Sequence, residues 1–139
     1  MESETRETIS RILNEQIQTE LPQIAITFDD GPSMCTPALL DGLKERGVKA
    51  TFFLVGENVE TYPDIVKRIY EEGHLIGNHT YHHVEITKLS DEEAMYEINK
   101  TDELIEAITG QRVQYIRPPL GSGRENWRII WTYYLSCGR

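Results

Sequence analysis

The feature of this sequence that most constrains its fold is an alternation of short apolar runs with amphipathic segments of helical period. Runs rich in β-branched and aromatic residues predict strands at residues 23–28, 50–55, 74–77 and 113–116. The helical segments between them end at three glycines, Gly47, Gly73 and Gly110. Strands that alternate with helices are typical of βαβ units, whose strands run parallel. We therefore predict an α/β fold built on a parallel sheet.

The helix that ends at Gly110 has the clearest start signal in the chain. Ser90 followed by Glu93 is the pattern of a capping box, and apolar residues then recur along one face as far as Ile108. Residues 6–20 show a similar period, so a short amphipathic helix is predicted there as well.

Composition excludes several classes of partner. A length of 139 residues suits one domain, and a net charge of −9 argues against nucleic acid and anionic membranes as partners. No apolar run approaches the roughly 20 residues of a transmembrane helix. The polar N-terminus does not resemble a secretory signal, so we expect the protein to stay inside the cell or its targeting segment to lie outside this chain. Cys35 and Cys137 match neither a zinc spacing nor a disulfide framework.

Residues with catalytic potential follow three of the predicted strands. Asp29 and Asp30 come after the first, His79 and His83 after the third, and Arg117 after the fourth. Ligand sites of parallel sheets lie at the carboxyl ends of the strands. We therefore expect these three segments to meet on one rim of the sheet.

The first segment, TFDDGP, places two carboxylates side by side. Like charges this close repel, and a bound cation would relieve the repulsion. A turn at Gly31 and Pro32 would leave one carboxylate free to bind a metal and the other free to act as a base. The alternative is an ordinary turn rich in Asp, Gly and Pro.

The second segment contains His79, His82 and His83, three of the four histidines in the chain. Two imidazoles and a carboxylate are a common ligand set for zinc-like metals and leave positions open for water and substrate. A spacing of four would place His79 and His83 together on one helical turn. The glutamate of an HExxH protease is absent. The alternative is an exposed histidine-rich loop.

The third segment, RPPLG, begins with Arg117. Its two prolines stiffen the loop, Gly121 permits a close backbone approach, and Arg117 could orient a carboxylate through a bidentate contact. The alternative is an ordinary surface loop.

Together, TFDDGP, HTYHH and RPPLG resemble the three leading motifs of the polysaccharide deacetylase family, the NodB-type carbohydrate esterases of family 4. The runs ATFF at 50–53 and GNHT at 77–80 also resemble that family's sequences. The resemblance covers residues 22–121. It implies a distorted, seven-stranded (β/α) barrel that hydrolyses acetyl groups, preferably N-acetyl, from peptidoglycan or a chitin-like glycan.

The resemblance also implies a role for each motif residue. Asp29 would be the catalytic base, and Arg117 would tether it. The metal ligands would be Asp30, His79 and His83, holding one divalent ion, zinc in preference to cobalt or nickel. Thr80 would support the histidine segment. The backbone N–H of Leu120, which stands where the family usually has an aromatic residue, would bind the oxyanion.

Two later motifs of the family are missing, an Asp-x-x-Asp-Trp segment and a Leu-x-His whose histidine acts as general acid. We therefore divide the chain into a helical or linker segment (1–21), an incomplete catalytic domain with its later strands missing (22–121) and an atypical tail (122–139). The tail holds both tryptophans and three arginines, and we hypothesise that a frameshift or premature stop produced it. Translation of the downstream DNA in the other two frames would test this.

Three functions remain open at this stage. The first is the deacetylase. The second is a remnant that binds metal or glycan without turnover, favoured by the missing late histidine, for which His74 and His82 are stand-ins only by proximity. The third is a hydrolase of small cyclic amides, a chemistry found on related barrels. The expected partner is an acetylated glycan; family members usually work at the cell envelope or outside the cell, and the oligomeric state is left open.

Overall fold

The computed structural model describes residues 24–121, so the predicted helix at 6–20 and the tail 122–139 lie outside the described residues. The strands are β1 (Thr27–Gly31), β2 (Thr51–Leu54) and β3 (Leu75–Asn78). The helices are α2 (Thr36–Glu45), α3 (Gly56–Thr61), α4 (Pro63–Glu71) and α5 (Asp91–Thr109). Short 3₁₀ turns, η1 (Ile86–Lys88) and η2 (Pro119–Gly121), complete the described part. None of the described helices is both long and apolar enough to cross a membrane.

The sheet confirms the predicted α/β fold. Its order is β1-β2-β3 and both pairings are parallel, with Thr51 opposite Thr27 on one side and Leu75 on the other. β1 begins and ends later than predicted, because residues 24–26 are not strand, whereas Asp29, Asp30 and Gly31 belong to the strand and not to the loop after it.

The segment 113–116, predicted as a fourth strand, forms only an isolated parallel bridge between Ile116 and Asn78. Asn78 donates to the Tyr115 carbonyl at 2.8 Å and accepts from the Arg117 N–H at 2.9 Å. Pro118 and Pro119 follow at once and have no N–H to extend a ladder. The segment therefore joins the sheet only at the carboxyl end of β3, where it brings Arg117 beside the histidine segment.

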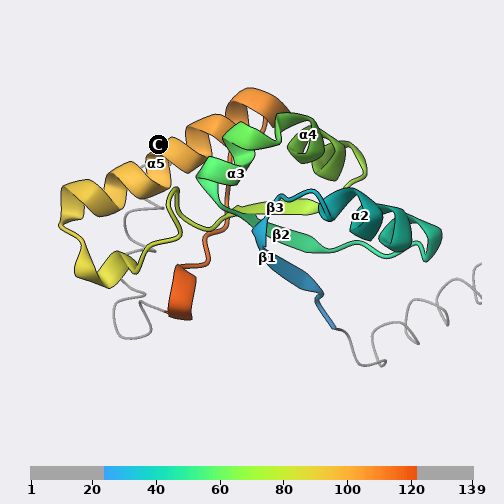
Figure 1. Cartoon of the computed structure of the whole chain (residues 1–139), viewed down its shortest axis with the longest axis horizontal. Coiled ribbons are helices and arrows are strands. Elements are labelled where there is room, and N and C mark those ends of the chain that lie inside the picture. The colour runs from blue at the N-terminus through green and yellow to red at the C-terminus, as the bar shows by residue number, and fades with distance from the viewer. Residues whose placement is uncertain (1–23, 122–139) are drawn as a thin grey trace, which may run out of the picture.

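The described helices lie on one side of the sheet (Figure 1). Most of their apolar residues form the main core with β2, in which the side chains of Leu40, Leu54, Val59, Val66, Ile69 and Ile105 are almost completely buried. Ile98 of α5 packs with Ile86 in a second, smaller cluster. The opposite face carries large apolar side chains that remain exposed, Leu75 at 56% and Tyr115 at 47%. The core thus packs against one face of β2 and β3, while Leu75 and Tyr115 are exposed on the other.

The helix α5 begins and ends as predicted. The Ser90 hydroxyl accepts from the Glu93 N–H while the Glu93 carboxylate accepts from the Ser90 N–H, and Gly110 ends the helix in the left-handed region at φ 69°. The hydrogen bonds from Ser90 lower the pKa of Glu93.

The helix α3 was not predicted, because its six residues directly follow β2 and show no helical period of their own. Its first residue, Gly56, is required by packing. A Cβ at this position would lie 2.3 Å from the Tyr81 ring and 2.7 Å from the Thr101 hydroxyl. This close approach lets α3 contact the histidine segment directly.

Candidate metal centre

Three side chains from separate segments meet at the carboxyl end of the sheet. One oxygen of the Asp30 carboxylate, Oδ1, lies 3.2 Å from His79 Nε2 and 3.0 Å from His83 Nε2. Among the described residues these three are the one group of histidine, cysteine and acidic side chains that could hold a metal ion, with ligand atoms all within 4.8 Å of one another. The expectation that β1 and the segment after β3 would meet is confirmed.

The hydrogen bond on the far side of the His79 ring fixes which nitrogen can act as a ligand. His79 is 3% exposed, and its Nδ1 lies 2.5 Å from the Arg117 carbonyl oxygen. A carbonyl oxygen can only accept, so Nδ1 carries the proton. In a neutral ring the lone pair is then on Nε2, which faces Asp30. A second hydrogen bond of this kind is usual for histidines that bind metals.

The histidines meet for a different reason from the one predicted. Residues 79–85 are not helical, so the one-turn argument for His79 and His83 was wrong. Thr80 and His83 instead adopt left-handed backbone conformations, at φ 67° and 55°. These two reversals bring the rings to a centroid separation of 5.1 Å. Residues 79–83 are called the histidine loop from here on.

Left-handed backbone marks the whole candidate site. The described non-glycine residues with positive φ are Asp30, Thr80, His83 and Leu120, and each lies in one of the three motif segments. This conformation costs about 1–3 kcal/mol for most residues and persists only where the surroundings enforce it. Its concentration here indicates that the fold holds these segments in a specific geometry.

Asp29 stands apart from the three clustered side chains. The guanidinium of Arg117 donates to Asp29 Oδ1 at 2.7 Å and to the Thr27 hydroxyl at 2.9 Å. The same guanidinium lies 4.1 Å from the centroid of the Phe53 ring, a cation–π contact that supports it from β2. The structure therefore places Arg117 where the family resemblance predicts a tether, with Asp29 held by an arginine and Asp30 facing two histidines.

Leu120 lies in η2, next to the same rim. Its side chain is 75% exposed and its backbone is left-handed at φ 58°. The role predicted for its N–H stays a prediction.

Three supporting residues were missed by the sequence analysis. Asn58 on α3 donates to the Asp30 carbonyl at 2.8 Å. Asn78, fully buried at the end of β3, accepts from the Thr80 N–H at 2.7 Å and donates to the Ile98 carbonyl and the Asp102 carboxylate. Glu97 on α5 contacts the histidine loop. The sequence held one signal for Glu97, because this acidic residue falls at a position of the apolar period of α5 where a buried side chain is expected.

The remaining histidines have partners elsewhere. His82 Nδ1 lies 2.6 Å from Glu97 Oε1. His74 precedes β3, at the opposite end from His79, and accepts from the Ala50 N–H at 3.2 Å. Burial, reinforced by the charge of Lys49, lowers the pKa of His74. Neither of these two histidines belongs to the cluster around the Asp30 carboxylate.

The surface beside the histidine loop is also charged and aromatic. Tyr81 donates from its hydroxyl to Glu60 at 2.7 Å, which raises the pKa of Tyr81 to about 12. Lys100 lies 5.5 Å from the centroid of the Tyr81 ring and pairs with Glu60.

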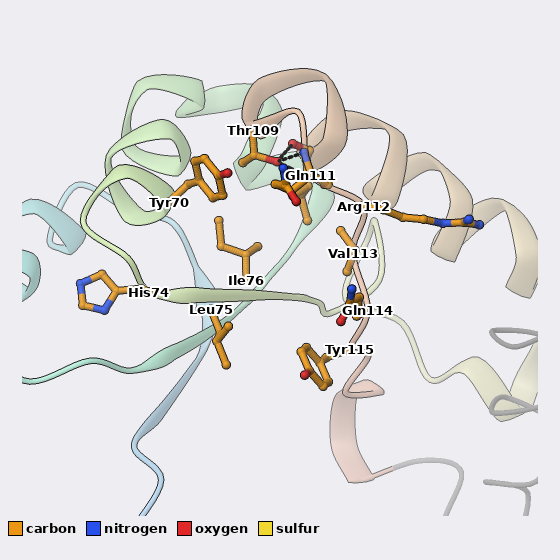
Figure 2. Close-up of a pocket in the computed structure, with 11 residues that line it drawn as sticks. Tyr70, His74, Leu75, Ile76, Thr109, Gln111, Arg112, Val113, Gln114 and Tyr115 are labelled. Carbon is orange, nitrogen blue, oxygen red and sulfur yellow. Dashed lines mark hydrogen bonds between the residues drawn. The ribbon is translucent and has the colours of Figure 1, made fainter. Parts of the chain in front are cut away.

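A pocket of about 200 Å³ lies near His74 (Figure 2). Its lining comes from the end of α4, the start of β3, the end of α5 and the segment 111–115. None of the motif residues lines it. The pocket is therefore a feature of the amino end of β3, not of the candidate metal centre.

The donor set suits a zinc-like ion. Zinc is bound at about 2.0–2.2 Å by histidine nitrogen and carboxylate oxygen, so two ligands of one ion lie roughly 3–4 Å apart. The distances from Asp30 Oδ1 to His79 and His83, 3.2 and 3.0 Å, are in that range. A set of two imidazoles and one carboxylate also leaves coordination positions open, and the Asp30 side chain is 69% exposed toward solvent. The arrangement is one that could hold a divalent ion at the rim of an α/β sheet.

Comparison with known proteins identifies the family. The polysaccharide deacetylase family model matches residues 16–133, and the chain belongs to that family. A peptidoglycan-N-acetylglucosamine deacetylase of Bacillus cereus is 51% identical over 110 residues, covering 78% of this chain and 40% of the relative.

Solved structures extend the similarity to the fold. The peptidoglycan deacetylase PdaC of Bacillus subtilis superposes with a TM-score of 0.75 at 41% identity, over 79% of this chain and 55% of that one. A family 4 carbohydrate esterase of Streptomyces lividans, in complex with acetate, gives a TM-score of 0.75 at 32% identity, over 80% and 58% of the two chains. The predicted fold class, a partial barrel of the deacetylase type, is confirmed. The chain spans about half the length of these solved structures.

Proposed function

We propose that this protein hydrolyses acetyl groups from a polysaccharide at a divalent metal ion held by Asp30, His79 and His83. The observation that carries the proposal is that two adjacent aspartates have different partners. Asp30 faces two imidazole nitrogens at 3.0 and 3.2 Å, whereas Asp29 is held 2.7 Å from the Arg117 guanidinium. A hydrolase of this kind needs both a metal-binding carboxylate and a separate base.

Zinc is the metal that the donor set favours, with cobalt and nickel as alternatives. A bound ion of this kind supplies Lewis acidity toward the acetyl carbonyl and lowers the pKa of a water molecule to about 7. The ion would be held from two sides of the sheet rim, by Asp30 at the end of β1 and by the histidine loop after β3.

Asp29 takes the proton from the attacking water in the proposed mechanism. The Arg117 guanidinium donates a hydrogen bond to its carboxylate and so holds it in one direction. The backbone N–H of Leu120 donates to the oxyanion that develops on the acetyl oxygen. When the intermediate collapses, the bond between carbonyl carbon and nitrogen breaks, the leaving nitrogen takes the proton that Asp29 removed from water, and acetate and a free amine are released.

The substrate class follows from the relatives. The names of the matching proteins of Bacillus cereus and Bacillus subtilis specify N-acetylglucosamine and N-acetylmuramic acid of peptidoglycan, and another relative is a chitin deacetylase. We propose an N-acetylated glycan of the peptidoglycan or chitin type as the substrate of this chain.

A second candidate function is binding of metal or glycan without turnover. It is supported by the positions of the two remaining histidines, because His74 contacts the Ala50 N–H and His82 contacts Glu97. Neither is placed to protonate a leaving amine beside Asp30. Acetate release by the purified chain separates the two functions.

The test uses the full chain with added zinc and two matched variants. Asp30→Asn is expected to lose both zinc and acetate release from a chitooligosaccharide or peptidoglycan. Asp29→Asn is expected to keep zinc and to release acetate about 10²–10⁴-fold more slowly, the usual contribution of a general base. Zinc content is measured by elemental analysis and acetate by an enzyme-coupled assay.

Each outcome separates one function from the others. Zinc bound by the wild type without acetate release would support the binding function. Turnover of a small cyclic amide but of no glycan would support a cyclic amide hydrolase. Full zinc content in Asp30→Asn would rule out the proposed metal site.

A further inference from the structure

Glu97 is a buried acid that none of the motif residues explains. It lies on α5, is 5% exposed, and points its carboxylate at the histidine loop. Oε2 accepts from the Tyr81 N–H at 2.9 Å and from the His82 N–H at 2.8 Å. Oε1 lies 2.6 Å from His82 Nδ1. A single carboxylate therefore binds two consecutive backbone N–H groups and the imidazole ring of His82.

These hydrogen bonds offset a substantial cost. Burial of a carboxylate is unfavourable unless it is paired or hydrogen-bonded, and three donors on two oxygens satisfy that condition. The N–H groups of Tyr81 and His82 lie in a loop that is neither helix nor strand, so no carbonyl oxygen of a helix or sheet accepts from them. Glu97 replaces them.

The position of the two peptide groups gives the contact its importance. Tyr81 and His82 lie between His79 and His83, the two proposed ligands. Their N–H groups lie in the middle of the backbone segment that joins the two histidines. Holding these N–H groups in place therefore determines the positions of the two imidazole rings.

The opposite side of the same loop is held by α3. The N–H of Gly56 donates to the Thr80 carbonyl at 3.0 Å, and the N–H of Glu57 donates to the Tyr81 carbonyl at 3.1 Å. The loop is therefore held by its carbonyls on α3 and by its amides on α5. Of these two attachments, the one on α5 depends on a single side chain, which mutation can remove without altering the backbone.

The loop conformation also requires external support. Thr80 and His83 are left-handed, at φ 67° and 55°, on either side of the two peptide groups that Glu97 holds. Such residues return to negative φ when the surroundings stop enforcing the strained conformation. Release of Tyr81 and His82 would let His83 turn away from Asp30.

We propose that Glu97 is a positioning residue of the metal centre: its carboxylate, by binding the backbone N–H groups of Tyr81 and His82, sets the separation of His79 and His83 that the metal requires. The inference rests on the proposed metal site and adds to it a residue that lies 15 positions after His82. Glu97 acts through the loop and does not touch the ion.

The test compares zinc affinity among four versions of the full chain by calorimetric titration. Glu97→Ala removes both acceptors and is expected to bind zinc about 10–100-fold more weakly, the usual effect of losing a group that orients metal ligands. Glu97→Gln keeps one oxygen that can accept from both N–H groups, while its amide faces a His82 ring that can accept in its other neutral tautomer. Its affinity is expected within about threefold of the wild type. Glu103→Gln, at an exposed position of the same helix, is the matched control.

A second variant covers the case in which Glu97→Ala does not fold. Glu97→Asp keeps the buried charge but withdraws the oxygens by one methylene, so it is also expected to weaken zinc binding while circular dichroism stays that of the wild type. Wild-type affinity in a folded Glu97→Ala or Glu97→Asp would overturn the proposal. So would a loss in Glu97→Gln as large as that in Glu97→Ala.

Amide hydrogen exchange tests the same contact without metal. In zinc-free protein, Glu97→Ala or Glu97→Asp is expected to speed exchange at Tyr81 and His82 while the amides of β2 keep their protection. Unchanged exchange at both residues would overturn the proposal. A wild-type chain that binds no zinc would refute the proposed metal site, and the exchange result would then decide by itself whether Glu97 sets the loop.

Discussion

The strand β3 has a buried histidine at each end, and the two have different surroundings. His74 is 5% exposed and His79 is 3% exposed. His74 accepts from the Ala50 N–H and meets the Phe52 ring edge-on, with ring centroids 5.3 Å apart. His79 is hydrogen-bonded to the Arg117 carbonyl on one side and faces Asp30 on the other. Burial is the same at both ends, so it does not mark the functional histidine.

The difference lies in what the free ring nitrogen faces. At the amino end the acceptor nitrogen of His74 is used by a backbone N–H, which is a structural hydrogen bond. At the carboxyl end the Arg117 carbonyl accepts a hydrogen bond from His79 Nδ1. The lone pair on Nε2 is then directed at the Asp30 carboxylate and the His83 imidazole. The strand therefore separates a structural histidine from a candidate ligand over four residues.

The largest difference is expected when each histidine is removed in turn. His79→Ala should weaken zinc binding by more than about 100-fold, beyond the usual effect of groups that only orient ligands. His74→Asn keeps an acceptor for the Ala50 N–H and should bind zinc like the wild type. Calorimetric titration of both variants measures the difference.

His83→Ala controls for misfolding, since its side chain is 37% exposed and its removal leaves no buried cavity. It should lose zinc as His79→Ala does. Equal zinc affinities in His74→Asn and His79→Ala would remove the contrast between the two ends of β3.

The sequence predicted the contrast only in part. The rule that parallel sheets bind ligands at the carboxyl ends of their strands correctly grouped Asp30 with His79 and His83. It could not indicate Asn58 or Glu97, because these residues lie on helices and reach the site through backbone groups of another segment. The helical-turn argument for the histidine loop failed because left-handed residues are set by tertiary contacts that a spacing of four does not reveal.

The middle of β3 connects the two ends and provides the second prediction. A Cβ at Gly77 would lie 2.6 Å from two carbons of the Phe53 ring and 3.1 Å from the Tyr115 carbonyl. Gly77→Ala should therefore lower the free energy of unfolding by about 1–3 kcal/mol, the usual cost of overpacking. Urea denaturation measures it.

Gly42→Ala is the matched control, because Gly42 lies inside α2 and its nearest contact for a Cβ is the end of the Arg46 side chain at 3.4 Å. It should raise stability by about 0.5–1 kcal/mol through helix propensity. If Gly77→Ala were as stable as the wild type, the Phe53 ring would be free to move and could not support Arg117.

A variant of Arg117 can separate metal binding from catalysis at the carboxyl end of the sheet. The backbone carbonyl of Arg117 holds the proposed ligand His79, whereas its side chain holds the proposed base Asp29. Arg117→Lys keeps the carbonyl but loses the planar guanidinium that reaches both Asp29 and Thr27. Zinc affinity should stay unchanged while kcat/KM for acetate release falls about tenfold, or about 1.4 kcal/mol. A parallel loss of zinc would mean that the side chain also positions the metal ligands.

The smallest expected effect is at the amino end and concerns pH. Burial and the Lys49 charge lower the pKa of His74, so the unfolded chain takes up this proton more readily than the folded one. The stabilisation from a neutral His74 is complete above the unfolded value of about 6.5 and is lost as pH falls toward the lower folded pKa. The difference in unfolding free energy between the wild type and His74→Asn should be constant above about pH 7.5 and should shift against the wild type below about pH 6.5. Urea denaturation of zinc-free protein at several pH values measures it. Parallel pH profiles would show that His74 protonates as easily in the folded chain as in the unfolded one, and the amino end of β3 would then lose its distinguishing environment.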